Sequence, residues 1–390
     1  MRTPLQSTGA LPALTSIRFF AALIVALSHF TQLGLLTLPA AFLAFVDGGR
    51  PAVSLFFVLS GFVLTYTYHS TMDAAGAMRF YVARFARIYP VTLMSLLIAT
   101  SVTIYLLRTE NSLLLSDWYS INTHVYVSLL VSLAAQLLLL TGWFPFASIN
   151  QPWNGPAWSI SCEVFFYALF PWLLRKLRVR APLTLTLICV VLWILQGVWI
   201  LCVSRYVPSG RRGFLISQFP LTHLSEFVMG IGAAICFVRV RASGRPSHRL
   251  GIILTCAALI AMTLLAAWQP IKPAYYLEAP FFAALVFGLA LLEQPVLGLL
   301  NHRPLIVLGE ASFSLYLIHV PLAHWAHIVG FHRDNGWIAL LVAVCLSVAI
   351  HLYFEEPMRK LIRYGNGSRQ RGTPPPPRTL PTIGTEYTRR

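Results

Sequence analysis

The sequence predicts an all-α fold: a polytopic transmembrane helix bundle of about ten crossings with one re-entrant or interfacial segment. Hydrophobic residues make up 57% of the 390 residues and charged residues only 11%, whereas soluble domains carry roughly 25% charged residues. Apolar runs near the length of one membrane span, about 20 residues, recur along the chain. Short connections rich in Lys and Arg separate these runs, as is typical of cytoplasmic loops.

Eleven apolar segments are candidates for membrane helices. They cover residues 11–36, 51–69, 88–107, 124–141, 156–174, 182–203, 219–238, 250–268, 280–293, 304–329 and 336–354. We expect them to form one transmembrane domain over residues 1–363. Residues 364–390 contain Gly, Ser, Arg and a run of four prolines but little that is apolar, which predicts a disordered cytoplasmic tail.

Positive charges in the short connections set the expected orientation. Basic clusters follow the second, fifth, seventh and last segments, and the cytoplasmic side should hold all of them. Eleven strict crossings from an inside N-terminus would place the basic cluster after the fifth segment and the C-terminus outside, so one segment does not cross. Three prolines between residues 142 and 156 favour the region 124–160, because broken backbone is tolerated at membrane depth only inside protein or along a wet cavity. We therefore expect a multi-pass protein of the cell membrane with both termini cytoplasmic.

The formal net charge of +16 does not indicate a nucleic-acid partner. The arginines fall between apolar runs rather than among the aromatic residues of a soluble surface, so an anionic lipid leaflet is the expected counterpart. The six cysteines lie inside apolar runs without CxxC spacing. We interpret them as packing residues and predict no metal site.

Ionisable residues inside the predicted spans are the first functional candidates, since each costs at least about 2.5 kcal/mol to insert. Arg18 and His29 are eleven residues apart, just over three helical turns, and share one face over about 16 Å. Alternatively, Arg18 extends to the headgroups and His29 is an ordinary core histidine. Glu163 follows the broken segment and must be protonated or paired, with Arg18, His29 or Arg50 as the partners to test.

Two further groups of polar residues are functional candidates. Arg84 and Arg87 are three residues apart on one side of a helix, and paired guanidinium groups suit a polyphosphate. Without the other motifs, ordinary cytoplasmic charge would be the preferred explanation. The tenth segment carries Tyr316 and His319 among hydroxyl side chains.

In chain order these segments resemble the membrane-bound acyltransferase family 3, whose members O-acetylate bacterial surface polysaccharides and acylate sugars of some macrolides. The resemblance runs from Leu11 to about Lys360 and rests on five motifs in register. The motifs are Arg-x10-His at Arg18 and His29, Gly-Arg-x-x-Val-x-x-Phe-Phe-x-x-Ser-Gly from Gly49 to Gly61, Arg-x-x-Arg at Arg84 and Arg87, Asn-Gly-Pro-x-Trp-Ser-x-x-x-Glu-x-x-Phe-Tyr from Asn154 to Tyr167, and Ser-Phe-Ser-Leu-Tyr-Leu-Ile-His-x-Pro from Ser312 to Pro321.

The resemblance implies acyl-CoA, usually acetyl-CoA, as a cytoplasmic co-substrate, with no bound cofactor. His29 is then either the general base for the acceptor hydroxyl or a nucleophile that is itself acylated, and Glu163 orients a cationic partner. The residues expected to bind the CoA phosphates are Arg18, Arg84, Arg87 and Arg50. Arg50, or hydroxyl groups near Ser60 and Ser159, can also hold the oxyanion.

The resemblance also implies a carbohydrate acceptor, either a surface polysaccharide or a glycosylated small molecule such as a macrolide. The residues expected to bind the acceptor are Ser60, Trp158, Ser159, Tyr316 and His319. Many family members append a soluble esterase-like domain, whereas this chain ends in the predicted tail. The residues leave open the acceptor, its side of entry, the acyl chain length and the oligomeric state.

Three other functions are compatible with a polytopic membrane protein. A secondary transporter commonly shows two related halves with matching broken helices, whereas this sequence has a single broken segment and no internal repeat. A glycosyltransferase that uses a lipid-linked sugar would be expected to carry acidic residues in the first outer loop, where Asp47 stands alone. A non-catalytic scaffold would not need the Arg18–His29 pair.

Overall fold

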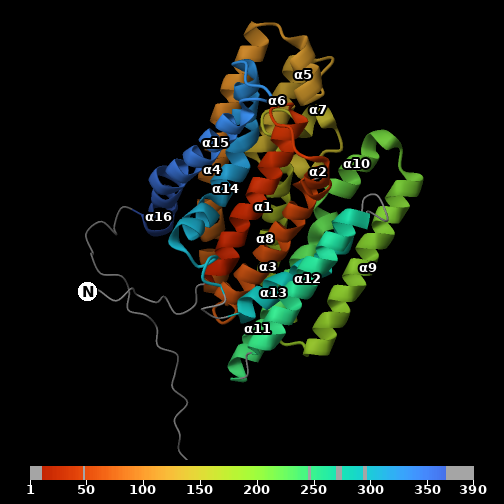
Figure 1. The fold of residues 1–390 in the computed structure, drawn as a ribbon, viewed down its shortest axis with the longest axis vertical. Helices are drawn as coiled ribbons and strands as arrows, with labels where there is room; N and C mark the ends of the chain where they lie inside the picture. The colour runs from red at the N-terminus through yellow and green to blue at the C-terminus, as the bar shows by residue number, and fades with distance from the viewer. Residues whose placement is uncertain (1–10, 47–48, 245–246, 269–274, 293–296, 366–390) are drawn as a thin grey trace, which may run out of the picture.

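The computed structural model describes residues 11–46, 49–244, 247–268, 275–292 and 297–365, and all regular structure in these ranges is helical (Figure 1). Nine helices in the described ranges are long and apolar enough to cross a membrane. They are α1 (Pro12–Gln32), α3 (Arg50–Tyr68), α4 (Ala74–Arg108), α8 (Trp158–Leu177), α9 (Pro182–Tyr206), α11 (Leu224–Ala242), α12 (His248–Trp268), α14 (Arg303–Ile328) and α15 (Gly336–Ile350), the last of which continues through the π-helix η6 (His351–Glu355) into α16 (Glu356–Tyr364). The all-α polytopic prediction is confirmed.

Shorter elements connect the long helices. They are α2 (Ala40–Val46), α5 (Ser112–Tyr119), α6 (Val125–Leu137), α7 (Ala147–Asn150), α10 (Ser209–Ser217), α13 (Ala279–Leu291) and the 3-10 turns η2 (Thr141–Trp143), η3 (Gly155–Ala157), η4 (Pro220–His223) and η5 (Tyr275–Glu278). As expected, the region 124–160 is broken, because α6 is only 13 residues long and short turns follow it. A tenth crossing would be α13, also 13 residues long, so the count of ten and the cytoplasmic termini stay predictions. The predicted tail lies outside the described residues from 366 onward.

Helix α4 is longer than the apolar pattern indicates. We expected a helix over residues 88–107, but α4 begins at Ala74, where the Asp73 side chain accepts a hydrogen bond from the Gly76 backbone nitrogen at 2.5 Å. The N-cap explains the early start. Arg84 and Arg87 therefore lie within the same 35-residue helix as the apolar run, and their positions are fixed relative to the bundle.

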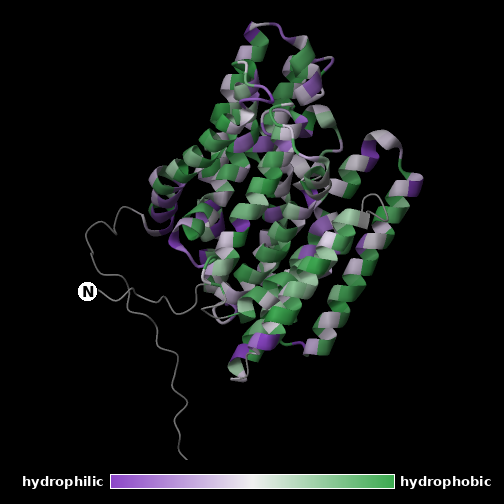
Figure 2. Ribbon diagram, in the orientation of Figure 1, coloured by the Kyte–Doolittle hydropathy of each residue, from purple (hydrophilic) through white to green (hydrophobic). Residues whose placement is uncertain are grey.

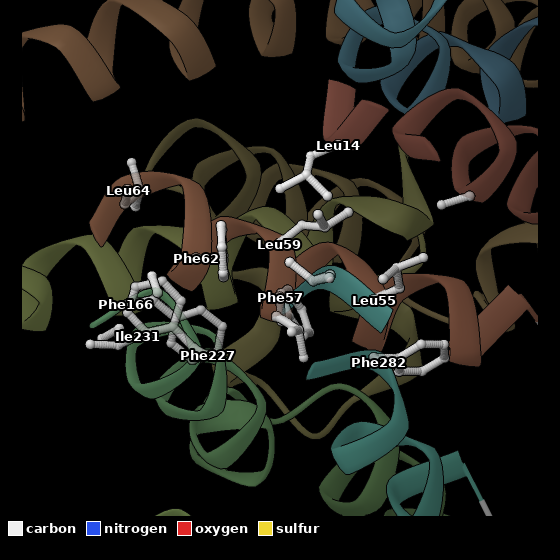
Figure 3. Close-up of a cluster of buried hydrophobic side chains, with 14 of the residues drawn as sticks. Leu14, Leu55, Phe57, Leu59, Phe62, Leu64, Phe166, Phe227, Ile231 and Phe282 are labelled. Atoms are coloured by element: carbon white, nitrogen blue, oxygen red, sulfur yellow. The ribbon is translucent and has the colours of Figure 1, made fainter. Parts of the chain in front are cut away.

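Small residues let α3 and α11 pack with their backbones in contact. A Cβ atom on Gly61 would meet the Phe227 carbonyl oxygen, and one on Gly230 would meet the Val58 carbonyl oxygen. Close approach of this kind is a main source of helix association in membranes, where lipid is as apolar as the core. Beside this contact, the rings of Phe166 and Phe227 stack with centroids 4.9 Å apart (Figure 3).

Glycines also allow close backbone contact of α14 and α15 with α1 and the residues just after it. A Cβ on Gly309 of α14 would meet the Thr15 carbonyl oxygen of α1, and a Cβ on Gly336 of α15 would meet the Leu35 carbonyl oxygen just after α1. These two contacts hold α1 near both of its ends. The Arg18–His29 face is therefore set against α14, which carries the Tyr316 and His319 motif.

The outer surface is apolar where a membrane would contact it. Helices α9 and α12 lie along one side of the bundle (Figure 1), and hydrophobic residues cover most of their length (Figure 2). Only 22% and 11% of their most apolar windows are buried. Such a surface is stable in lipid but not in water.

Three of the predicted cytoplasmic connections meet at one end of the bundle. The Arg239 guanidinium donates to the Arg178 carbonyl oxygen at 2.8 Å, and the Arg178 guanidinium donates to the His69 carbonyl oxygen at 3.4 Å. The connections after α3, α8 and α11 are thus adjacent. This agrees with a shared membrane side for their positive charges, while the identity of that side stays a prediction.

Candidate active site

A large cavity lies at the end of the bundle that carries α5, α7 and α10. Its volume of about 560 Å³ is within the usual range for small-molecule sites. The exposed residues Arg50, Asp117, Gly210 and Gly213 line it, so it opens at this end. Other polar and aromatic lining residues are His29, Gln32, Trp118, Asn150, Gln151, Trp158, Phe214, Gln218, Tyr316 and His324.

His29 contributes to this cavity from the last part of α1. Its Nδ1 atom lies 2.9 Å from Nε2 of His319. The other ring nitrogen of His319, Nδ1, lies 3.2 Å from the Leu315 carbonyl oxygen one turn earlier in α14. His319 is fully buried and lines neither cavity described here. The structure thus joins His29 to a residue that we expected to contact the acceptor.

A second, much smaller cavity lies among α1, α3, α8 and α14. Its volume is about 30 Å³, and Arg18, Glu163 and Ser159 line it together with Phe313. Val53 and Tyr316 line both cavities. Arg18 and His29 therefore face two cavities that border the same pair of residues.

Hydrogen bonds fix Tyr316 at this boundary. The Ser159 hydroxyl donates to the Tyr316 oxygen at 2.8 Å, and the Tyr316 hydroxyl donates to the Pro156 carbonyl oxygen at 3.2 Å. Pro156 lies in the turn before α8, and Asn154 in the same segment donates to the Leu317 carbonyl oxygen at 2.8 Å. The broken segment thus holds α8 and α14 in register where the cavities meet.

Arg84 and Arg87 lie beside the small cavity. The Arg87 guanidinium carbon lies 5.9 Å from the ring centre of Phe313, which lines that cavity, and the Arg84 guanidinium carbon lies 5.9 Å from the Tyr167 ring. The Arg84 Nε atom is buried and has no hydrogen-bond partner among the described residues. A buried, unpaired donor is costly, so an anion would be stabilised here.

Arg18 and Glu163 complete this basic region. Arg18 interacts electrostatically with Arg87, Glu163 and Glu355. Glu163 accepts a hydrogen bond from the Tyr167 hydroxyl at 2.9 Å. The region therefore contains more positive than negative groups, as a polyanion requires.

Two expected site residues lie apart from the groups to which we assigned them. Arg50 lines the large cavity, whereas Arg18 lines the small one, so Arg50 does not join the basic region. Ser60 lines neither cavity and instead forms a hydrogen bond with Tyr167. Trp158 lines the large cavity and Ser159 the small one.

Another buried histidine, His223, is paired with a carboxylate rather than with a second histidine. The Nδ1 atom of His223 lies 3.2 Å from both carboxylate oxygens of Glu226, and its Nε2 atom lies 3.2 Å from the Ser217 carbonyl oxygen. Gln196 donates to the same carboxylate at 3.0 Å. Both ring nitrogens of His223 are thus occupied, which is the arrangement of a structural pair rather than of a catalytic base.

Sequence reasoning missed part of the large cavity. Asp117 and Trp118 lie on α5, and Asn150 and Gln151 lie in the broken segment. The Trp118 ring stacks on His324 with centroids 4.1 Å apart and planes 6° apart. The polar residues near residue 150 were a usable signal, because broken backbone at membrane depth lines cavities. No pattern in residues 112–119 indicated that α5 would reach the site.

Sequence reasoning also missed a polar network beside the basic region. Ser314 donates to Glu355 at 2.9 Å, and His351 Nδ1 lies 3.1 Å from the same carboxylate oxygen. Both His351 and Glu355 lie in the π-helix η6, an irregularity that is frequent at functional sites. Across the described ranges, no group of three or more His, Cys, Asp or Glu residues is placed to hold a metal ion.

Comparisons with known proteins identify the family to which the chain belongs. A family model for an acyltransferase domain matches residues 11–355. Acyltransferase MdmB of Streptomyces mycarofaciens is 31% identical over 381 residues, which cover 90% of this chain and 92% of that protein. Peptidoglycan O-acetyltransferase OatA of Listeria monocytogenes is 23% identical over 397 residues, covering 95% of this chain and 59% of that protein.

No solved structure matches the chain. The family match nevertheless extends through all five motifs and through every residue described for the two cavities, and the resemblance stated from the sequence is confirmed. The chain is a polytopic membrane protein that belongs to this acyltransferase family.

Proposed function

We propose that this protein is an integral membrane O-acyltransferase that moves an acyl group, usually acetyl, from acyl-CoA to a carbohydrate hydroxyl. The observation that carries the proposal is the pair of cavities bordered by Val53 and Tyr316. Arg18 lies on one cavity and His29 on the other. A donor and an acceptor that enter from opposite ends would meet next to a base.

The basic region is the proposed donor site. Arg18, Arg84 and Arg87 supply three guanidinium groups beside a cavity of about 30 Å³. A space of this size holds little more than a water molecule, so the side chains that line it would have to move apart to admit the slim pantetheine arm. The CoA phosphates would stay at the bundle end, where charge-assisted hydrogen bonds from guanidinium groups are strong. The buried Nε atom of Arg84 would gain the partner that it lacks.

The large cavity is the proposed acceptor site. It has room for a sugar with part of its aglycone or chain, at about 560 Å³. Trp158 and Phe214 offer aromatic surface, while Asp117, Asn150 and Gln151 offer groups that bind hydroxyls. The similarity to a peptidoglycan O-acetyltransferase supports a glycan acceptor. A surface polysaccharide and a glycosylated small molecule such as a macrolide both fit this chemistry.

The proposed reaction begins when His29 accepts the proton of the acceptor hydroxyl. The hydroxyl oxygen attacks the thioester carbonyl, and Arg50 in the large cavity stabilises the oxyanion. The carbon–sulfur bond then breaks, the proton passes from His29 to the departing thiolate, and free CoA and an ester remain. Glu163 would orient Arg18 toward the donor. A variant of this route acylates His29 first.

The test is release of CoA thiol by purified protein in detergent, measured with acetyl-CoA and a panel of sugars and glycosylated macrolides. Release should require an acceptor, and His29→Ala should lower it by about 100-fold or more. The exposed His332 provides a matched control, because His332→Ala should turn over like the wild type. Equal release by wild type and His29→Ala would contradict the proposal. A burst of thiol without acceptor would favour acylation of His29.

A further inference from the structure

The contact between His29 and His319 also determines which ring nitrogens carry a proton. Each imidazole has one nitrogen that donates and one that accepts while it is neutral. His319 is fully buried, and burying its charged form would be costly without a counterion. The two contacts of His319 therefore determine where its single proton lies.

The Leu315 carbonyl oxygen fixes that proton on Nδ1 of His319. A carbonyl oxygen can only accept, so the 3.2 Å contact requires an N–H at His319 Nδ1. Nε2 of His319 then carries a lone pair and must accept the proton of His29 Nδ1, 2.9 Å away. The Val25 carbonyl oxygen also accepts a hydrogen bond from the His29 ring. This second acceptor likewise requires a ring nitrogen of His29 that carries a proton.

We propose that His319 is a positioning residue that holds His29 in the Nδ1–H tautomer, so that His29 Nε2 is the atom that accepts the acceptor's proton. This inference rests on the proposed function of His29 as a base. It assigns His319 a role through His29 rather than a contact with the acceptor. The opposite tautomer would direct an N–H into the cavity, and His29 would then be a hydrogen-bond donor that cannot take up a proton.

Two substitutions of His319 separate positioning from packing. His319→Gln keeps an oxygen that accepts from His29 and an amide that donates to Leu315, whereas His319→Leu keeps volume but no acceptor. We expect His319→Leu to lower kcat on the order of 100-fold, with the KM of acyl-CoA and of the acceptor changed by less than about threefold. His319→Gln should retain kcat to within about tenfold of the wild type.

Other kinetic results would overturn the inference. A rise in acceptor KM with unchanged kcat in His319→Leu would mean that His319 contacts the acceptor. Equal losses in the Gln and Leu variants would mean that shape, rather than the accepting atom, matters. Full activity of His319→Leu would mean that the Val25 carbonyl alone is enough to orient His29.

A spectroscopic measurement tests the tautomer without any turnover. The full chain, labelled with ¹⁵N-histidine and reconstituted in lipid, is compared with His29→Asn to assign the His29 signals by NMR. The inference predicts a protonated Nδ1 and an unprotonated Nε2 for His29, while a protonated Nε2 overturns it. If thiol release fails but this tautomer is found, the proposed function is wrong and the histidine geometry is right. If release succeeds and the other tautomer is found, only this inference is wrong.

Discussion

The two cavities of this protein differ in size, charge and origin. The large one, about 560 Å³, is bounded mainly by short elements and holds one exposed carboxylate, Asp117, with one exposed guanidinium, Arg50. The small one, about 30 Å³, lies between long helices beside three arginines. This difference indicates that the two cavities bind different substrates. Rigid helices present charge to a polyanion of constant structure, while shorter segments form a roomier, nearly neutral site for a hydroxylated acceptor.

The largest expected effect is a loss of affinity for acyl-CoA that leaves the affinity for the acceptor unchanged. The double substitution Arg84→Ala and Arg87→Ala removes two guanidinium groups, each of which is expected to contribute about 1.5–3 kcal/mol to binding of a charged partner. We expect the KM of acyl-CoA to rise about 100-fold or more, with the KM of the acceptor unchanged. Steady-state thiol release with one substrate varied at a time measures both constants.

The same helix provides the control. Arg79 lies near the start of α4 with its side chain 72% exposed, so Arg79→Ala should leave both constants near those of the wild type. A rise in acceptor KM in the double variant would show that the arginines do not belong to a separate donor site.

A smaller effect is expected at the other cavity. Asp117 is exposed on its lining, so Asp117→Ala should not disturb packing. Loss of one hydrogen bond to a charged group should raise the acceptor KM about tenfold, with the KM of acyl-CoA unchanged. Asp334, whose side chain is 91% exposed, is a matched control outside the cavity. An unchanged acceptor KM in Asp117→Ala would remove Asp117 from the proposed acceptor site.

The smallest expected effect is a pH dependence at the arginine end. His69 follows α3, and burial together with Arg178 and Arg239 lowers its pKa below the usual 6.5. The unfolded chain then binds the proton more readily, so folding stability is lost as pH falls below about 6.5. Because solvent partly screens His69, the effect is small. The Tm measured in detergent should fall by less than about 2 °C when the pH is lowered from 7.5 to 5.5. His69→Gln should abolish this shift, and a larger shift in the variant would contradict the assignment.

Most of the fold could be predicted from the sequence because lipid imposes long apolar runs on a spanning helix. Nine of the eleven expected segments contain a helix long enough to span. The start of α4 was missed because Arg79, Arg84 and Arg87 interrupt the apolar pattern, although arginines do not end a helix. The length of α6 was also overestimated, because the apolar run 124–141 continues past the end of the helix at Leu137.

Site residues that belong to a sequence motif could be predicted, whereas site residues that tertiary packing brings to the cavities could not. The Arg18 and His29 spacing placed both residues on one helix face, and the structure brings them to adjoining cavities. The separation of Arg50 from the other arginines depends on which end of α3 meets which neighbour, and no local pattern encodes that. Asp117 reaches the cavity through the tertiary position of α5. The burial of His319 depends on the tertiary packing of α14 in the bundle, which no local pattern encodes.

The most direct test of the account is whether donor and acceptor can act from opposite sides of a membrane. Purified protein is reconstituted in vesicles with a labelled, membrane-impermeant glycan acceptor inside and acetyl-CoA outside, and ester formation is measured. The account predicts acetylated glycan in the lumen with wild type and none with His29→Ala. Product that forms only when both substrates are on the same side would contradict the arrangement of two cavities that meet at Tyr316.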